Sequence, residues 1–161
     1  MVAVFVATRG PVERVENPHQ VPAWKYPAAH GPKAPSFVRA TRADACGHRW
    51  CWVSGTASIR GHESVAPGDL ATQLKVTLEN LDVVLGSLGL PLMGVEPPGG
   101  TRVLTKVYLR DGGKLDEVRD GLGAAAAGAL FVEADICRAE LELEIEVSVV
   151  TDCLFPASAS R

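Results

Sequence analysis

The sequence predicts an α+β fold in which a mixed β-sheet carries two helices packed on one face and is preceded by a proline-rich arm. Three observations lead to this prediction. First, stretches with alternating apolar residues occur before, between and after two stretches with a helical pattern. Second, one of these helical stretches repeats leucine every three or four residues. Third, residues 9–40 are rich in Pro and Gly. The 161 residues suit a single domain over 1–161, with a strand and arm over 1–45 and a core over 46–155.

The composition is that of an ordinary globular protein, with 47% hydrophobic residues, 22% charged residues and a net charge of -3. Lys and Arg are scattered, so we expect no nucleic-acid partner. The chain has no run of eighteen apolar residues, so we expect no membrane partner. The apolar run within residues 1–18 lacks a preceding basic segment and a cleavage site, which favours a strand over a signal peptide. We therefore expect a cytoplasmic location.

The cysteines match no zinc-ligand spacing, and this includes the stretch CGHRWC with its His48. They are Cys46, Cys51, Cys137 and Cys153, and free thiols are expected in a cytoplasmic protein. No glycine-rich phosphate loop precedes a helix either. We therefore predict that the chain binds no metal and needs no cofactor.

The prolines of residues 9–40 prevent a long helix and favour an extended arm. An arm of this kind wraps a surface or frames a site. Its aromatic and charged residues are therefore candidates for substrate binding: His19, Trp24, Lys25, Tyr26, His30 and Arg39. The alternative is that Trp24 and Tyr26 only anchor the arm to the body of the domain.

The core begins with a strand through HRWCWVSGTASI that ends at Gly55, followed by a loop, RGHESVAPGD. From Asp69 the apolar period changes to that of an amphipathic helix, with Asp69 as its N-cap and Gly89 as its end. Its apolar stripe consists of Leu70, Leu74, Leu78, Leu81, Leu85 and Leu88.

The second half of the core repeats the change of period. Residues 101–111 alternate and predict a strand, and a shorter helix begins near Asp111 and is broken by Gly121 and Gly123. One face of the strand carries Val103, Thr105, Val107 and Leu109. Residues 130–150 supply one or two strands with a turn around Asp135 to Arg138.

The stretch ELELEIEV, residues 140–147, places a glutamate at every second position. In a strand these carboxylates share one face, spaced roughly 7 Å apart, while the intervening apolar residues face the other way. One interpretation is a solvated face above a core. The other is that one carboxylate is a catalytic acid or base in a cleft covered by a neighbouring chain.

Four stretches together resemble the RidA/YjgF superfamily over about residues 50–150: VSGTASIRGHES, LATQLKVTLENLDVVLGSLGL, VLTKVYLRD and VEADICRAELELEIEV. Within it, GTASIRGHES, ADICRAELELEIE and the arm are more similar to the chorismatases. The resemblance implies a chorismate-mutase-like fold that forms a homotrimer with sites between subunits. It also implies that Glu144, the first Glu of EIE, is catalytic, with Glu146 on the same face.

Two departures from the family pattern limit what the resemblance implies about the reaction. Imine-hydrolysing members hold the substrate carboxylate with an arginine fifteen residues before the first Glu of EIE, where this chain has Ala129. Imine deamination is therefore disfavoured. Chorismatases are about twice as long as this chain, which matches only their second half.

Three functions follow from these residues. The first is an enzyme of specialised metabolism that catalyses metal-free proton transfer, such as ring closure or aromatisation of a small carbazole-type precursor, with Glu144 as the acid or base and Trp24, Tyr26 or Trp52 as flat walls. The second is hydrolysis or elimination on chorismate, whose carboxylates need cationic partners, available in Lys25, Arg39, Arg60 and Arg138. The third is a trimer that binds a small molecule without turnover.

Three further side chains have competing interpretations. His62 and Glu63 form either an acid/base pair or part of a surface loop. Arg138 either binds substrate or pairs with Asp135 or Glu140. Cys137 fits a small buried residue in a strand better than a nucleophile.

Overall fold

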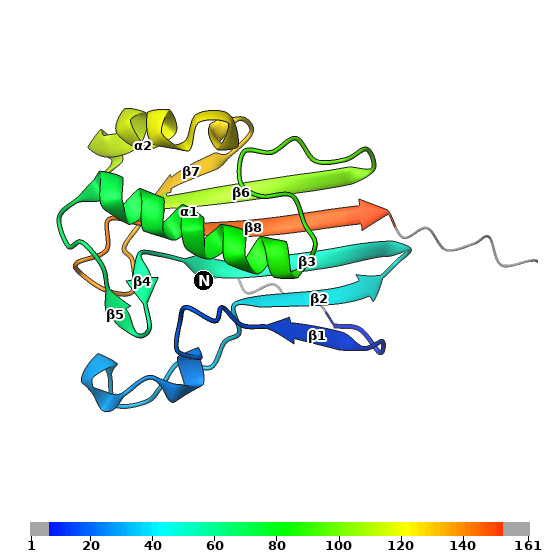
Figure 1. Cartoon of the computed structure of the whole chain (residues 1–161), viewed down its shortest axis with the longest axis horizontal. Coiled ribbons are helices and arrows are strands. Elements are labelled where there is room, and N and C mark those ends of the chain that lie inside the picture. The colour runs from blue at the N-terminus through cyan, green and yellow to red at the C-terminus, as the bar shows by residue number, and fades with distance from the viewer. Residues whose placement is uncertain (1–6, 153–161) are drawn as a thin grey trace, which may run out of the picture.

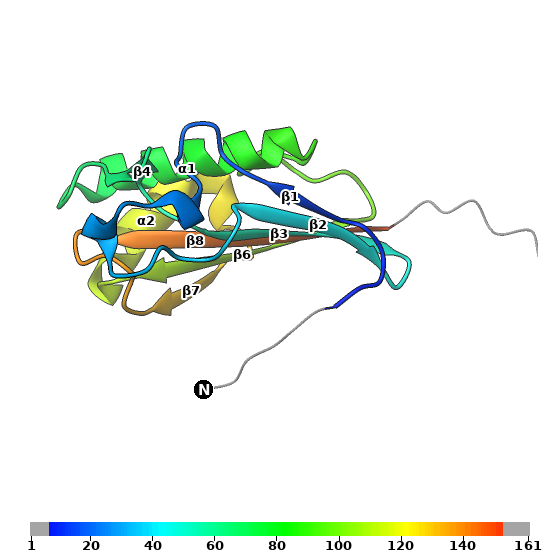
Figure 2. The ribbon, with the colours of Figure 1, turned by 90° about the horizontal axis from the view of Figure 1, so that it is seen from below.

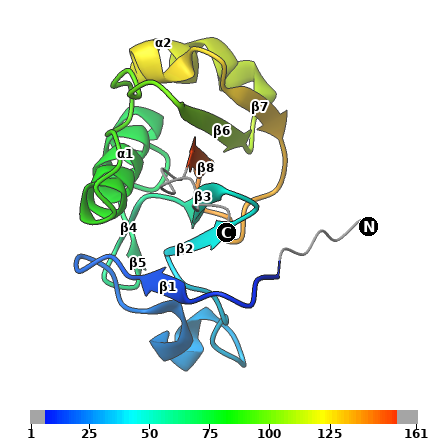
Figure 3. The ribbon, with the colours of Figure 1, turned by 90° about the vertical axis from the view of Figure 1, so that its right-hand side faces the viewer.

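The computed structural model describes residues 7–152, which form a six-stranded sheet with two α-helices on one of its faces (Figures 1 and 3). The strand order is β1-β2-β3-β8-β6-β7, and neighbours are antiparallel except for the parallel pair β6 and β7. The strands are β1 (Val12–Val15), β2 (Ala40–Ala45), β3 (His48–Thr56), β6 (Thr101–Leu109), β7 (Leu130–Glu133) and β8 (Leu143–Asp152). The predicted α+β class is confirmed.

The remaining elements lie at the ends and on one side of the sheet. The helices are α1 (Leu70–Ser87) and α2 (Leu115–Leu122), and none of the helices within residues 7–152 is long and apolar enough to cross a membrane. A separate hairpin consists of β4 (Ile59–Arg60) and β5 (Glu63–Ser64). Single 3₁₀ turns are η1 (Ala23–Lys25), η2 (Ala28–His30), η3 (Gly112–Lys114) and η4 (Gly123–Ala126).

The main core forms where the apolar face of β8 packs against α1 (Figure 2). The side chains of Leu143, Ile145, Val147 and Val149 are buried, while the residues between them face the side of the sheet that carries no helix. The leucine stripe of α1 is buried as predicted, except that Leu78 is only partly covered. The predicted ends of α1 are confirmed, because the Asp69 carboxylate accepts a hydrogen bond from the Thr72 N–H and Gly89 has a φ of +66°.

Several boundaries differ from the prediction. Strand β8 starts at Leu143, so the glutamate alternation of residues 140–147 begins in the preceding loop. The segment RGHES forms the β4–β5 hairpin and not a loop, and α2 starts at Leu115, one 3₁₀ turn after the predicted start near Asp111. Strand β2 was not predicted, because ATRADA has few β-branched residues and is stabilised as a strand by its pairing with β1 and β3. Part of the predicted N-terminal strand, residues 1–6, lies outside the described residues.

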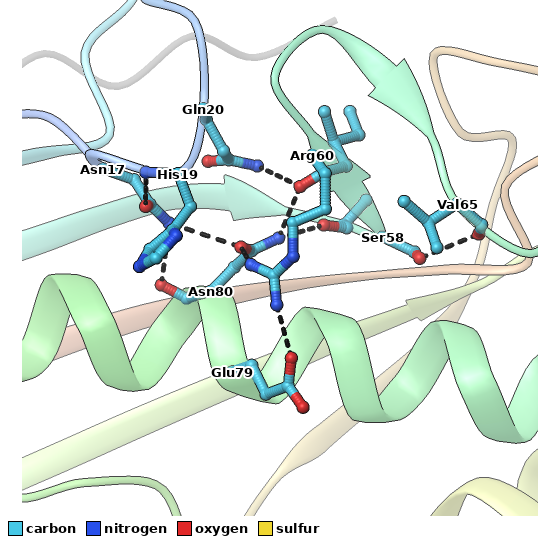
Figure 4. Close-up of polar contacts among 10 residues, drawn as sticks. Asn17, His19, Gln20, Ser58, Arg60, Val65, Glu79 and Asn80 are labelled. Atoms are coloured by element: carbon cyan, nitrogen blue, oxygen red, sulfur yellow. Dashed lines mark hydrogen bonds and ion pairs between the residues drawn. The ribbon is translucent and has the colours of Figure 1, made fainter.

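A buried polar network around Asn80 fastens the arm and the β4–β5 hairpin to α1 (Figure 4). The Asn80 amide donates to the carbonyl oxygens of Ala57 (3.1 Å) and Ile59 (2.9 Å), and its Oδ1 accepts from the Asn17 amide of the arm. The guanidinium of Arg60 also donates to Asn80 and forms an ion pair with Glu79. The network therefore fixes the position of the arm relative to the sheet.

Replacement of Asn80 is expected to destabilise the fold strongly. Asn80→Ala removes the hydrogen bonds from its buried amide to the carbonyl groups of Ala57 and Ile59, and it removes the side-chain acceptor of the Asn17 amide and the Arg60 guanidinium, which costs on the order of 2–4 kcal/mol of unfolding free energy. Glu79→Ala, which removes only an exposed ion pair on the same helix, should cost less than about 1 kcal/mol. Urea unfolding of the two variants measures the difference, and equal losses would contradict the structural role of Asn80.

Candidate functional site

A cavity of about 330 Å³ lies where the arm meets β3, β8 and the loop between β7 and β8. This volume suits a small organic molecule. The residues that line it are Tyr26, His30, Pro35, Phe37, Arg39, Ser54, Gly55, Ala57, Ile59, Cys137, Arg138 and Glu144. The arm, β3 and β8 are far apart in the sequence, so the site exists only in the folded chain.

The carboxylate of Glu144 is the acidic group of the cavity. It stands on the face of β8 opposite α1, because Leu143 and Ile145 on either side point into the core. Burial raises the pKa of Glu144 above its ordinary value, and the nearby negative charge of Glu146 raises it further. Glu144 therefore retains its proton at a higher pH than an exposed glutamate does.

The space for this carboxylate is provided by Gly55 of β3. A Cβ atom at position 55 would lie 1.9 Å from Oε1 of Glu144, a distance that no real structure tolerates. The pairing of β3 with β8 shifts register between Val53 and Thr56, a bulge of the kind that often adjoins active sites. The glycine and the bulge together let Glu144 fold against the strand beside it.

Arg39 is a cationic group of the cavity and is almost completely buried. Its Nη2 donates to the hydroxyl of Tyr26 (2.7 Å) and to the carbonyl of Val21 (3.2 Å), and the guanidinium lies 5.1 Å from the centre of the Phe37 ring. Its Nε has no hydrogen-bond partner within residues 7–152. A buried guanidinium with an unused donor is suited to hold an anion.

Arg138 is a second cationic group of the cavity and is partly buried. Its Nη1 donates to the carbonyl of His62 (2.9 Å) and the hydroxyl of Ser64 (3.1 Å), while its buried Nη2 has no partner in the described chain. The guanidinium also lies 5.5 Å from the centre of the Tyr26 ring. Neither of the carboxylates expected as an alternative partner forms a salt bridge with it, since Asp135 pairs with Arg110 and the carboxylate of Glu140 accepts from Ser64.

Arg110 holds the loop that presents Cys137 and Arg138 to the cavity. Its guanidinium donates to the carbonyl oxygens of Leu141 (2.9 Å), Ile136 (3.0 Å) and Arg138 (2.8 Å). The sequence pattern does not indicate a role for Arg110, because nothing in its neighbourhood along the chain distinguishes an arginine that binds backbone carbonyls from a solvated one. It positions the site without lining it.

Other residues predicted for the site lie outside the cavity. Glu146 accepts hydrogen bonds from the Lys106 ammonium (2.8 Å) and the Tyr108 hydroxyl (3.1 Å), Arg60 belongs to the Asn80 network, and Trp24 and Lys25 are exposed on η1. His62 reaches the cavity only through His30, whose Nε2 is 3.0 Å from its Nδ1. Among the site residues predicted from the sequence, the structure therefore brings together Tyr26, His30, Arg39, Arg138 and Glu144.

Cys137 differs from its prediction as a buried strand residue. It is exposed and lies in the loop between β7 and β8, where it lines the cavity. Desolvation nevertheless raises the pKa of its thiol, and the charge of Glu144 adds to this effect. The thiol therefore remains protonated near neutral pH.

A scan against protein-family models finds no match. The chain is 39% identical to a 3-hydroxybenzoate synthase of Streptomyces hygroscopicus over 82% of its length and 42% of that protein, and 36% identical to a chorismatase of the same organism over 91% of its length and 44% of that protein. A chorismatase crystal structure superposes on 87% of the chain and 44% of its own length with a TM-score of 0.71 and 32% identity. The chain resembles the chorismatases in sequence and has the fold of the RidA/YjgF superfamily.

The RidA/YjgF fold extends over most of this chain. Yeast Mmf1 superposes on 88% of it and on 99% of its own length with a TM-score of 0.64 at 16% identity, which shows the fold alone. The chain spans less than half the length of the curated relatives that it matches. Ala129, at the position of the arginine in imine-hydrolysing members, packs against the hydrophobic core and provides no cation.

The raised pKa of Glu144 has a consequence for stability. The unfolded chain releases this proton near the ordinary pKa of 4.5, below the pH at which the folded chain does, so stability falls as the pH rises from there through the folded-state pKa. Glutamine cannot ionise, so Glu144→Gln removes this pH-dependent loss of stability, and the variant should unfold at a higher temperature than the wild type at about pH 7.5. The difference should vanish below about pH 4.

Thermal unfolding across this pH range tests the burial of Glu144. Glu96→Gln, which replaces an exposed loop carboxylate, is the control and should leave the melting temperature unchanged at every pH. A Glu144→Gln variant that is less stable than the wild type at neutral pH would show that the carboxylate is stabilised, not desolvated.

Proposed function

We propose that this chain is an enzyme of specialised metabolism that acts on chorismate or a closely similar dicarboxylate, with Glu144 as the proton donor and acceptor. The observation that carries the proposal is that two guanidinium groups, those of the buried Arg39 and the partly buried Arg138, line the cavity that holds Glu144 and form no salt bridge within the described residues. Two cations match two carboxylates of one small substrate. The identity with a 3-hydroxybenzoate synthase and two chorismatases supports the same substrate class.

The chemistry needed at chorismate fits a carboxyl group with a raised pKa. Cleavage of its enol ether begins when an acid donates a proton to the terminal methylene carbon, which forms a C–H bond and leaves an oxocarbenium ion. Water then adds to this ion with loss of a proton and forms a hemiketal. The hemiketal collapses by breaking the bond between its carbon and the ether oxygen, which takes up a proton and stays on the ring, so the products are pyruvate and a ring diol. Elimination of water from the ring gives a hydroxybenzoate instead. Glu144 is suited to give the proton because burial keeps it protonated to higher pH.

The arm supplies the walls for a flat ring. Tyr26 and Phe37 line the cavity, and the contacts of both rings with Arg39 fix their positions beside the cation. Closure of a carbazole-type ring would also use Glu144, but a precursor without carboxylates would leave both guanidinium groups unpaired. The two arginines therefore favour the chorismate reaction over the cyclisation.

Release of pyruvate from chorismate on incubation with the purified chain tests the reaction, because pyruvate is formed whether the ring product is the diol or the hydroxybenzoate. Glu144→Gln should lower kcat by roughly 10²- to 10⁴-fold, since the amide cannot donate the proton. Glu146→Gln should lower it less than about tenfold, because Glu146 is paired with Lys106 outside the cavity. The opposite ranking would move the catalytic role to Glu146, and binding of chorismate without turnover would support a non-enzymatic protein.

Gly55→Ala examines the position of the carboxylate separately from its identity. The added methyl group displaces Glu144 while leaving its acidity available, so we expect a loss of kcat that approaches that of Glu144→Gln and a changed pH profile. Unchanged kinetics would mean that the reacting carboxylate lies elsewhere.

The helix-free face of the sheet supports assembly into a homotrimer. By the strand register, Leu130 and Val132 lie beside Lys106 and Tyr108 on this face, and they are 53% and 41% exposed. Leu104 and Val12 add further exposed apolar surface on the same face, and patches of this kind mark interfaces.

Light scattering coupled to size-exclusion chromatography should give a particle mass three times that of one chain. Leu130→Asp should reduce the particle mass to that of one chain. A monomeric wild type would contradict the assembly.

A further inference from the structure

Two imidazoles and a carboxylate converge where the arm meets the β4–β5 hairpin. His30 is the last residue of η2 in the arm. His62 lies in the turn of the β4–β5 hairpin, and Glu63 is the first residue of β5. Nδ1 of His62 lies 3.0 Å from Nε2 of His30 and 2.9 Å from Oε1 of Glu63, and the three atoms lie within 4.8 Å of one another. We propose that these residues form a binding site for a divalent transition-metal ion of the zinc class.

The arrangement of protons supports this assignment. A single ring nitrogen of His62 faces both partners, and in a neutral imidazole it carries either one proton or one lone pair. With the proton it donates fully to only one partner, and with the lone pair it repels the carboxylate. A cation between the three atoms uses the lone pairs of all of them at once.

The spacing of the three atoms is close to that of a coordination shell. Zinc–nitrogen bonds of about 2.0–2.1 Å in a tetrahedral site separate neighbouring ligand atoms by roughly 3.3 Å. The observed 2.9 and 3.0 Å open to this value through small side-chain rotations, which are available because His30 and Glu63 are exposed. Water would complete the shell.

The donor set selects the class of ion. Two imidazole nitrogens and one carboxylate oxygen suit zinc, cobalt or nickel, whereas magnesium and calcium prefer oxygen ligands throughout. The two charged groups beside the cluster are of opposite sign, since Arg138 donates to the backbone carbonyl of His62 and the carboxylate of Glu140 accepts from Ser64 on the same hairpin, so their effects on a bound cation oppose each other. The cysteine spacing gave no indication of this site, since none of its ligands is a thiol.

The proposed ion would act on the arm and not in the reaction. His30 lines the cavity and follows Tyr26, so a bond from His30 through the ion to the hairpin fixes the arm segment that covers the cavity. Tyr26 and His30 also contact each other, with ring centres 5.7 Å apart. Ion binding is therefore independent of the proposed chorismate chemistry.

Titration of the metal-free, reduced full chain with Co²⁺ tests the site. We expect one equivalent to bind with visible d–d absorption and without the near-ultraviolet band that a cysteine thiolate ligand would give. His30→Gln and Glu63→Gln should each weaken binding at least tenfold. His19→Gln, in the same arm but outside the cluster, should bind as the wild type does.

Limited proteolysis of the arm with and without Zn²⁺ gives the second readout. Zinc should slow cleavage between η1 and β2 in the wild type and in His19→Gln, and should have no effect in His30→Gln. The proposal is overturned if Co²⁺ fails to bind, if a thiolate band appears, or if both ligand variants retain wild-type affinity. Chorismate turnover enters none of these outcomes, so the ion site and the proposed function fail or stand separately.

Discussion

The packing of the apolar side of β8 against α1 determines where a carboxylate of this strand stands. Leu143, Ile145 and Val147 are almost fully buried, so the backbone has no freedom to turn Glu144 toward the helix. A shift of one residue in the β3–β8 register would bury the glutamates and expose the core. The cost of that exchange, several buried aliphatic side chains at roughly 1.5–3 kcal/mol each, holds the acidic group on the helix-free side.

Placement on that face does not by itself make a reactive group, as the comparison of Glu144 with Glu146 shows. Both alternate with core residues on the same strand. Glu146 stands opposite Lys106 in the ladder with β6 and is neutralised by it. Glu144 lies over Gly55, forms no salt bridge with any residue of 7–152, and is desolvated. The difference between a structural and a chemical carboxylate comes from the neighbouring strands.

Features set by residues close together in the chain could be predicted from the sequence, whereas features set by contacts between distant strands could not. Periodicity identified α1 with its caps, the two-faced β8 and the α+β class, since all depend on residues close together in the chain. It also selected Arg39 and Tyr26 from the composition of the arm. It could not separate Arg60, fixed by Asn80 and Glu79, from Arg138, which keeps an unused donor, because hydrogen-bond partners many residues away decide this.

The arm is the element that converts a strand face into a cavity. Without it, Glu144 would stand on an open sheet surface where water lowers the pKa of a carboxyl group toward its ordinary value. With it, Tyr26, Phe37 and Arg39 form one wall, and the Asn80 network anchors the arm at residues 17–20. Buried polar bonds on the helix side of the molecule thus set the desolvation of an acid on the opposite face, so substitutions far from the cavity that loosen the arm should change its chemistry before they unfold the domain.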